Sequence, residues 1–596
     1  MKDFLKMTLA VIVGLMIVSA ITTFLTFGII AAVSAAGKAT TQVPKDAVLK
    51  IDLSSMVLAE QTQDANPFES IQSENETRII GIWDAINTLN TAAQDPNVKL
   101  VYLKTDGNTS DVAHLQEFRK ALANFRSSGK AVISYIEAPS TGSYYLSSVS
   151  DKVYMTSHPG ATTMVSGVSS QMIFLKDLLD KLGVNVQLIR HGKYKSAGEM
   201  FVRNSSSEEN LLQQQVMINS IWNSLATEIA ASRDITVDEL NAAIDGLRLV
   251  EPEDFVNEKL VDEVLTRNEL KEKLTTFAMA DRFDKVNFVS FPDYLDSKAA
   301  LPVKISKQIA VIYADGDIVD GDDIKNVAGD RFAGIIAKVR ADSTVKAVVL
   351  RVNSPGGSVI ASDKIKAELD LLKKDKPLIA SYGSYAASGG YWISNNCTKI
   401  YSDATTLTGS IGVFSMIPDF SKTVRNIAHI NVTSVSSNKH GDMMSLMRPL
   451  DKDEQAYMLR SVEDIYEKFV STVSEGRHME KDFVDNIGQG RVWTGSDALA
   501  ISLVDEIGGI EDAIRYAAIC GGDVNLANWS VTGYPKPQTT LEMIMKMFNK
   551  SNPEENIFAG TILENASATM MKWADMANEG KADLTFARIP YEITIR

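Results

Sequence analysis

Ser388 lies in a run of small residues that could present its hydroxyl group as a nucleophile. The run reads Ala386-Ala-Ser-Gly-Gly-Tyr-Trp392 and follows an apolar segment, 378–381, that is expected to be a strand. Small neighbours allow the backbone to turn sharply and allow a substrate to approach. A helix expected over 389–395 would place free N–H groups and a positive dipole end beside the serine. This environment is typical of a site that stabilises a developing oxyanion.

A second glycine-rich turn, Asn353-Ser-Pro-Gly-Gly-Ser358, joins an expected strand to an expected helix. Its Gly356 and Gly357 can aim backbone N–H groups at a ligand. Both turns follow the carboxyl ends of expected neighbouring strands, which is where α/β sheets bind ligands. Either turn alone could be an ordinary tight connection, but the pair indicates a catalytic site.

A nucleophilic serine needs a base, and the residues leave several choices open. None of the six histidines has a local context that suggests a catalytic triad. A lysine can act instead if burial lowers its pKa toward neutrality. The candidates are Lys193, Lys195, Lys399 and Lys439. Lys399 has a counterpart at Lys152, which favours a structural role, but the residues alone do not decide among the others.

The chain contains an internal duplication, and only the later copy carries the glycine-rich turns. The stretch that begins at Val98 is repeated 247 residues later from Val345 (345 − 98 = 247). At this offset Thr141 stands where the later copy has Ser388, and 108–110 reads Asn-Thr-Ser where 355–357 reads Pro-Gly-Gly. A feature needed only for stability should be present in both copies. The difference therefore favours chemistry in the second copy.

Short apolar strands alternate with helical periodicity in both copies, which is typical of parallel βαβ units. The predicted fold is α/β, with two tandem domains and one core for each. The polar stretch 60–76 is expected to be a loop. The expected divisions are an N-terminal anchor, a first repeat, a linker, a second repeat and a C-terminal extension, over residues 1–37, 38–289, 290–307, 308–530 and 531–596.

The N-terminus is expected to cross a membrane once. Residues 7–37 contain no charged side chain, and roughly 20 apolar residues span a bilayer. Lys2 and Lys6 precede this run and favour a cytoplasmic N-terminus with the remaining chain exported. A cleaved signal peptide is the alternative, because Val33-Ser-Ala35 resembles a cleavage site. The apolar part of cleaved peptides usually has only about 7–15 residues, so the anchor is preferred.

Composition excludes some classes of function. The net charge of −15 makes nucleic acid an improbable partner, because phosphate binding needs a basic surface. Cys397 and Cys520 are too few for a disulfide framework and are expected to be small apolar residues. No cysteine and histidine cluster has the spacing of metal ligands, so neither a metal nor another cofactor is expected.

Four motifs together resemble the signal peptide peptidase A family in its long, two-domain bacterial form. They are Ser354-Pro-Gly-Gly357, Ala386-Ala-Ser-Gly-Gly-Tyr-Trp392, Leu407-Thr-Gly-Ser-Ile-Gly412 and Tyr194-Lys-Ser-Ala197. The segment Gly488-Gln-Gly-Arg-Val-Trp-Thr-Gly495, the duplication and the expected anchor also fit this family, and only the tail after residue 530 departs from it. The resemblance implies a fold related to the crotonase and Clp protease superfamily.

The resemblance also implies roles for individual residues. Ser388 would be the nucleophile of a Ser/Lys dyad, with Lys195 of the other half as its base. Ser410 would orient the lysine, and the N–H groups of Gly356 and Gly389 would form the oxyanion hole. The family is a membrane-bound homotetramer that degrades signal peptides left after secretion. For this chain that implies peptide substrates and an inner-membrane location with the catalytic part on the periplasmic side.

The function expected from the sequence is that of a membrane-anchored serine endopeptidase for apolar peptides, working without a cofactor. Two alternatives stay open at this point. A crotonase-like enzyme could use the same turns on acyl thioesters, although an exported location argues against that substrate. A degenerate repeat protein could also serve as a non-catalytic membrane scaffold.

Overall fold

The computed structural model describes residues 42–63, 77–158, 164–299, 307–536 and 585–588, together with Gly14. The expected membrane anchor, residues 1–37, and most of the extension 531–596 lie outside these ranges. Within them, no helix has both the length and the apolar character needed to cross a bilayer. The anchor therefore stays a prediction.

The first half is built on a parallel sheet with the strand order β8-β6-β5-β4-β1-β9. The strands are β1 (Ala47–Asp52), β4 (Val98–Lys104), β5 (Val132–Ile136), β6 (Lys152–Thr156), β8 (Glu263–Leu265) and β9 (Phe288–Ser290). Helices α3 (Ile82–Gln94) and α4 (Val112–Ser127) connect the first strands. The central strands are buried on both faces, which explains their continuous apolar sequences.

The second half repeats this order as β20-β16-β15-β13-β10-β21. The strands are β10 (Gln308–Asp315), β13 (Val345–Ser354), β15 (Leu378–Ala387), β16 (Lys399–Ser402), β20 (Glu506–Ile507) and β21 (Ser530–Tyr534). Helices α13 (Gly329–Ala341) and α14 (Val359–Asp375) match α3 and α4. Helices α8 (Glu208–Arg233) and α16 (Lys452–Arg477) also match, with 26 residues each. The predicted α/β class and the duplication are confirmed.

Strand β15 is longer than the sequence indicated, and its extra length leads to the serine. Its first part pairs with β16, and its last residues, Tyr385–Ala387, pair with β17 (Leu407–Gly409). Strand β17 pairs in turn with β19 (Val492–Thr494), which runs antiparallel to it. Because β15 changes its partner from β16 to β17 along its length, Ser388 lies at the end of the sheet, next to the segment that begins at Ser410.

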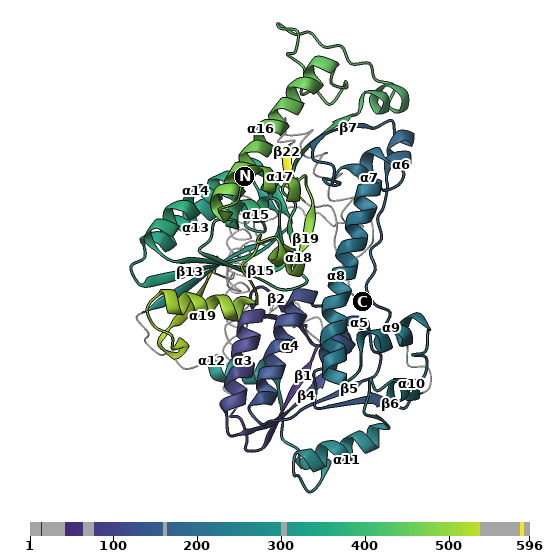
Figure 1. Cartoon of the computed structure of the whole chain (residues 1–596), viewed down its shortest axis with the longest axis vertical. Helices are drawn as coiled ribbons and strands as arrows, with labels where there is room; N and C mark the ends of the chain where they lie inside the picture. The colour runs from purple at the N-terminus through teal and green to yellow at the C-terminus, as the bar shows by residue number, and fades with distance from the viewer. Residues whose placement is uncertain are drawn as a thin grey trace, which may run out of the picture.

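A third sheet joins the two halves, with the order β12-β11-β14-β22-β18-β7. Strand β7 (Asn185–His191) belongs to the first half and pairs antiparallel with β18 (Val413–Asp419) of the second half over its whole length. The other strands are β11 (Ile318–Val319), β12 (Val327–Ala328), β14 (Gly356–Ser358) and β22 (Thr585–Arg588). In Figure 1, β7 and its neighbouring helices reach away from the first-half sheet towards α16.

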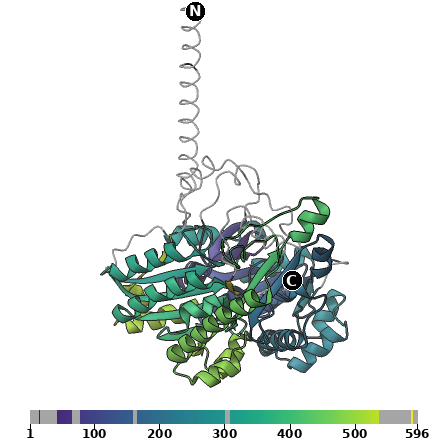
Figure 2. The same cartoon turned by 90° about the horizontal axis from the view of Figure 1, so that it is seen from above.

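The boundary between the halves differs from the expectation in two respects. The expected linker 290–307 is helical over Phe291–Ala299 (α12), and Phe291 and Tyr294 of this helix are fully buried. The cores do not separate at the repeat boundary either. One apolar cluster contains Phe118 of the first half together with Ile514 of the second half. The halves lie side by side in Figure 2, and they fold against a shared interior.

Candidate active site

Ser388 stands at the junction between β15 and helix α15 (Gly389–Ser394), with its side chain fully buried. Its backbone has φ 55° and ψ −111°, a conformation that non-glycine residues rarely adopt and that costs about 1–3 kcal/mol. Two backbone hydrogen bonds hold it there. The Ser388 N–H donates to the Gly409 carbonyl at 2.8 Å, and the Ser388 carbonyl accepts from the Trp392 N–H at 2.8 Å. Strain of this kind is characteristic of functional positions.

The structure brings Ser388, Lys195 and Ser410 together. The Lys195 Nζ lies 2.8 Å from the Ser388 Oγ, although the two residues are 193 positions apart and belong to different halves. The same Nζ lies 3.0 Å from the Ser410 Oγ and 3.3 Å from the Ser410 carbonyl oxygen. Ser410 also has a positive φ, 50°, and is buried. The amine is thus held by two hydroxyl groups and one carbonyl group of the second half.

Close packing of glycines lets Lys195 approach. A Cβ atom on Gly490 would lie 2.5 Å from the Lys195 Cβ, and one on Gly412 would lie 3.2 Å from the Lys195 Cδ. The preceding Tyr194 N–H donates to the Gln489 carbonyl at 3.0 Å. Any side chain at position 490 would therefore displace the lysine. Sequence reasoning included Gly490 in a motif but assigned it no role.

A partly buried ion pair fixes the lysine loop from its other side. The Arg190 Nη1 donates to the Lys195 carbonyl at 2.8 Å and to the Glu199 Oε1 at 3.0 Å. The buried Glu199 also accepts from the Ser207 hydroxyl at 2.7 Å. Sequence reasoning missed these positioning residues. The available signal was that Arg190 and Glu199 flank the small residues around Lys195.

Burial sets the protonation of the lysine. Only 1% of Lys195 is exposed, and this burial lowers the pKa of its amine to about 7. Among the residues that the structure describes, its cation would contact neutral hydroxyl and carbonyl groups and the Phe414 ring, whose centroid lies 5.9 Å from the Nζ. A neutral amine at 2.8 Å can accept the proton of the Ser388 hydroxyl, as nucleophilic catalysis requires.

The two glycine-rich turns touch beside the serine. A Cβ on Gly389 would lie 3.1 Å from the Gly356 Cα, and one on Gly390 would lie 2.7 Å from the Ser354 carbonyl oxygen. Gly389 is the first residue of α15, so its N–H has no partner within the helix. The Gly356 N–H donates to the Ser354 Oγ at 3.2 Å and would have to leave this hydroxyl to bind an oxyanion.

Two of the other candidate lysines form ion pairs that keep their amines charged. Lys399 hydrogen-bonds to Glu506 at 2.5 Å, and Lys439 to Asp453 at 2.9 Å. These bonds raise the pKa of both amines, which is the opposite of what a base requires. Lys193 is exposed, with its Nζ 5.3 Å from the Tyr194 ring centroid.

The equivalent position in the first half has a structural role. Thr141 is the first residue of α5 (Thr141–Ser147), which Ser140 and Ser143 cap with reciprocal hydrogen bonds. The Thr141 Oγ1 accepts from the Ser166 N–H at 3.1 Å. The hydroxyl group here completes a turn, and the strained backbone of Ser388 has no counterpart at this position.

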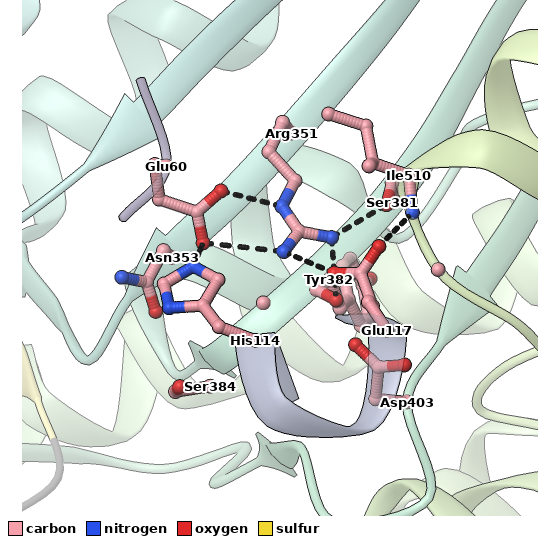
Figure 3. A network of polar contacts seen from close by, with 12 residues as sticks. Glu60, His114, Glu117, Arg351, Asn353, Ser381, Tyr382, Ser384, Asp403 and Ile510 are labelled. Carbon is pink, nitrogen blue, oxygen red and sulfur yellow. Dashed lines mark hydrogen bonds and ion pairs between the residues drawn. The ribbon is translucent and has the colours of Figure 1, made fainter. Parts of the chain in front are cut away.

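A buried ionic network, drawn in Figure 3, joins the two halves. Arg351 of β13 is fully buried. Its Nε lies 2.6 Å from the Glu60 Oε2, and its Nη2 lies 2.7 Å from the Glu117 Oε1. Its Nη1 donates to the Ser381 Oγ on β15 at 2.9 Å. Both carboxylates belong to the first half, so one guanidinium group connects the first half to the strands that carry the site.

The charges of this network are interdependent. Burial alone would raise the pKa of Glu60, but Arg351 and His114 hold it at about 2. Burial and the neighbouring Glu117 raise the pKa of Asp403 well above its ordinary value. Glu60 falls at the start of the stretch that was expected to be a polar loop, yet only 2% of it is exposed. That residue is part of the interior.

The potential metal ligands and the two cysteines are not among the residues that surround Ser388 and Lys195. Within the described ranges, ligand atoms of His440, Asp451 and Glu454 lie within 4.8 Å of one another. Glu454 already pairs with His440 and with Arg448, and Asp451 caps helix α16. These ion pairs and the helix cap therefore account for the clustering of the three side chains. The two cysteines are free, Cys397 buried as expected and Cys520 partly exposed.

Comparison with known proteins gives consistent results. The model of peptidase family S49 matches residues 124–280 and 370–523, once in each half. Protease 4 of Haemophilus influenzae is 34% identical over 504 residues, which cover 81% of this chain and 80% of that protein. The chloroplastic serine protease SPPA of Arabidopsis thaliana is 31% identical over 442 residues, 72% and 64% of the two chains. A putative signal peptide peptidase SppA of Enterococcus faecium is 36% identical over 180 residues, 30% and 52%.

The fold, the buried serine and these similarities together define a serine protease. The chain belongs to peptidase family S49, in a form with two family regions in tandem. Because of this family membership, the chain is classed neither with crotonase-like thioester enzymes nor with non-catalytic membrane scaffolds.

Proposed function

We propose that this protein hydrolyses peptide bonds with a Ser/Lys dyad. Neutral Lys195 takes the proton of the Ser388 hydroxyl as its Oγ attacks the peptide carbonyl, and the lysine passes that proton to the leaving amine. Water then hydrolyses the acyl-enzyme, with Lys195 again as base. Ser410 orients the amine, and the N–H groups of Gly389 and Gly356 stabilise the oxyanion. The observation that carries the proposal is the 2.8 Å contact between a buried Nζ and the Ser388 Oγ.

The proposed substrates are extended, largely apolar peptides, including signal peptides left after secretion. The name of the Enterococcus relative and the motifs shared with its family support this choice. The same family likeness supports a homotetramer anchored in the inner membrane by residues 1–37, with 38–289 supplying the base and 308–530 the nucleophile on the periplasmic side. A fold related to crotonases and Clp proteases is part of this proposal.

A fluorophosphonate probe tests the nucleophile. The wild-type protein should be labelled at Ser388, and Ser388→Ala should not be labelled, because the probe reacts with an activated serine hydroxyl. The substitution removes one oxygen atom in a buried position, so circular dichroism should show an unchanged fold. Label that persists on folded Ser388→Ala would assign the nucleophile elsewhere. Hydrolysis of acyl thioesters without labelling would instead support the crotonase-like alternative.

The pH dependence tests the base. Lys195 is a cation below its pKa of about 7 and cannot accept a proton, whereas above it the amine is free. The value of kcat/KM for an uncharged peptide should therefore rise with pH between 6 and 8, with half of the maximum near pH 7. The peptide must lack titratable groups so that the profile reports the enzyme. A profile that is flat or falls over this range contradicts the assignment.

A further inference from the structure

The proposed active site adjoins a slot that is one strand wide, between β14 and β18. Strand β14 begins at Gly356, one of the proposed oxyanion donors. Strand β18 contains Phe414, whose ring centroid lies 5.9 Å from the Lys195 Nζ. Both strands pair antiparallel with β22, the strand that lies between them. The two facing edges present backbone hydrogen-bonding groups to an extended peptide.

The strand in this slot comes from the C-terminal end of the same chain. In β22, Arg588, Ala587 and Phe586 are opposite Gly356, Gly357 and Ser358 of β14. On the other edge, Phe586 and Thr585 are opposite Phe414 and Ser415 of β18. Figure 1 shows β22 as the short yellow strand. An extended segment of this chain thus lies beside the proposed catalytic groups.

A side-chain contact supports the register of β22. The Arg588 Nη2 lies 3.2 Å from the Asp317 Oδ1, in the turn between β10 and β11. Asp317 immediately precedes Ile318, which pairs with Gly357 of β14. The ion pair is partly exposed, so its energy is modest, but it favours the register in which Arg588 is opposite Gly356.

Occupation by β22 and binding of a substrate strand are mutually exclusive. A peptide whose carbonyl reaches Gly356 and Gly389 would have to pair with the same edge of β14. Ser388 and Lys195 are at most 1% exposed with the slot filled. Access to the dyad along this slot therefore requires that β22 leaves it.

We propose that residues 585–588 are an intramolecular competitor that occupies the peptide-binding groove and that substrate must displace. The inference rests on the proposed function, since it assumes that the groove beside Ser388 binds substrate. A tethered segment multiplies the KM for substrate by one plus the ratio of its closed to its open population. It leaves kcat unchanged once the groove has opened.

Removal of the segment tests the proposal. A chain ending at residue 584 should show a KM for an apolar fluorogenic peptide that is lower by about 10-fold, with kcat unchanged. The same truncation in the Ser388→Ala background should lower the peptide Kd by a similar factor, measured by fluorescence anisotropy. The Kd reports binding without turnover, so it separates the groove from the chemistry.

A full-length variant gives a second test that keeps the tail. Arg588→Glu places a carboxylate beside Asp317 and should lower KM in the same direction, by a smaller factor. Arg596→Glu, eight residues further along, is the matched control and should leave KM unchanged. A free peptide of residues 583–590 should inhibit the truncated enzyme competitively, and a scrambled peptide should not.

The outcomes separate the two proposals. Unchanged KM and Kd in both the truncated chain and Arg588→Glu, in enzyme that cleaves peptides normally, would overturn the competitor and leave the dyad intact. Equal peptidase activity in the wild type and Ser388→Ala would overturn the proposed function itself. If the truncated chain does not fold, the KM of full-length Arg588→Glu, compared with that of Arg596→Glu, decides the matter.

Discussion

Lys195→Met is expected to lower kcat/KM for an apolar fluorogenic peptide by about 10⁴-fold or more, which is the scale of loss when a member of a serine protease's catalytic triad is removed. The reason is that only the Lys195 amine lies within hydrogen-bond distance of the Ser388 Oγ among the candidate lysines. Methionine fills a similar volume and carries no charge that burial must neutralise. The variant should therefore unfold at no lower temperature than the wild type.

Lys193→Met is the matched control for this experiment. It removes the same group two residues away, from an exposed side chain that lies over the Tyr194 ring. Most of the activity should remain. Loss of activity in Lys193→Met, with activity kept in Lys195→Met, would reassign the base. Equal losses in both variants would indicate that the substitutions disturb the loop and not the proton transfer.

Arg351→Met should lower the free energy of unfolding by about 3–5 kcal/mol, because removing one partner of a buried ion pair leaves uncompensated charge in the interior. Glu60 and Glu117 both depend on this guanidinium group, and each is about 1% exposed at its side chain. The loss should appear as a lower midpoint in urea unfolding at pH 7. Because the carboxylates and the arginine come from different halves, the contact between the halves should weaken first.

Lys364→Met provides the comparison for stability. Lys364 lies 2.7 Å from Asp330, and both side chains are about half exposed, at 42% and 56%. Exposed pairs of this kind contribute less than about 1 kcal/mol. A change in Arg351→Met no larger than that in Lys364→Met would contradict a stabilising role for the buried network.

Much of the architecture could be predicted from the sequence because it depends on local pattern. Apolar runs and helical periodicity repeat at a fixed offset, and they gave the α/β class and the two equivalent sheets. Ser388 could be identified for the same reason, since its small neighbours and its difference from Thr141 are visible in the chain. The length of β15 and the helix α12 were not predicted, because both depend on pairing and burial against distant segments.

The proposed base is the clearest case in which the residues alone were insufficient. Family resemblance selected Lys195, but the residues by themselves left several lysines open. A lysine becomes a base only when burial depresses its pKa, and burial here comes from the pairing of β7 with β18 and from the packing of Gly490. These contacts join positions that are hundreds of residues apart, so they have no local signal in the sequence.

The sequence by itself determined that this chain is a duplicated α/β protein, and it placed the candidate nucleophile in the second copy. The tertiary structure decided which lysine meets that serine, that Glu60 is buried against Arg351, and that β22 lies between β14 and β18. The physical reason is the same in each case. Strand and helix periodicity depends on residues that are close in the sequence. The pKa values, buried ion pairs and strand pairing depend instead on which distant segments pack against one another and exclude water.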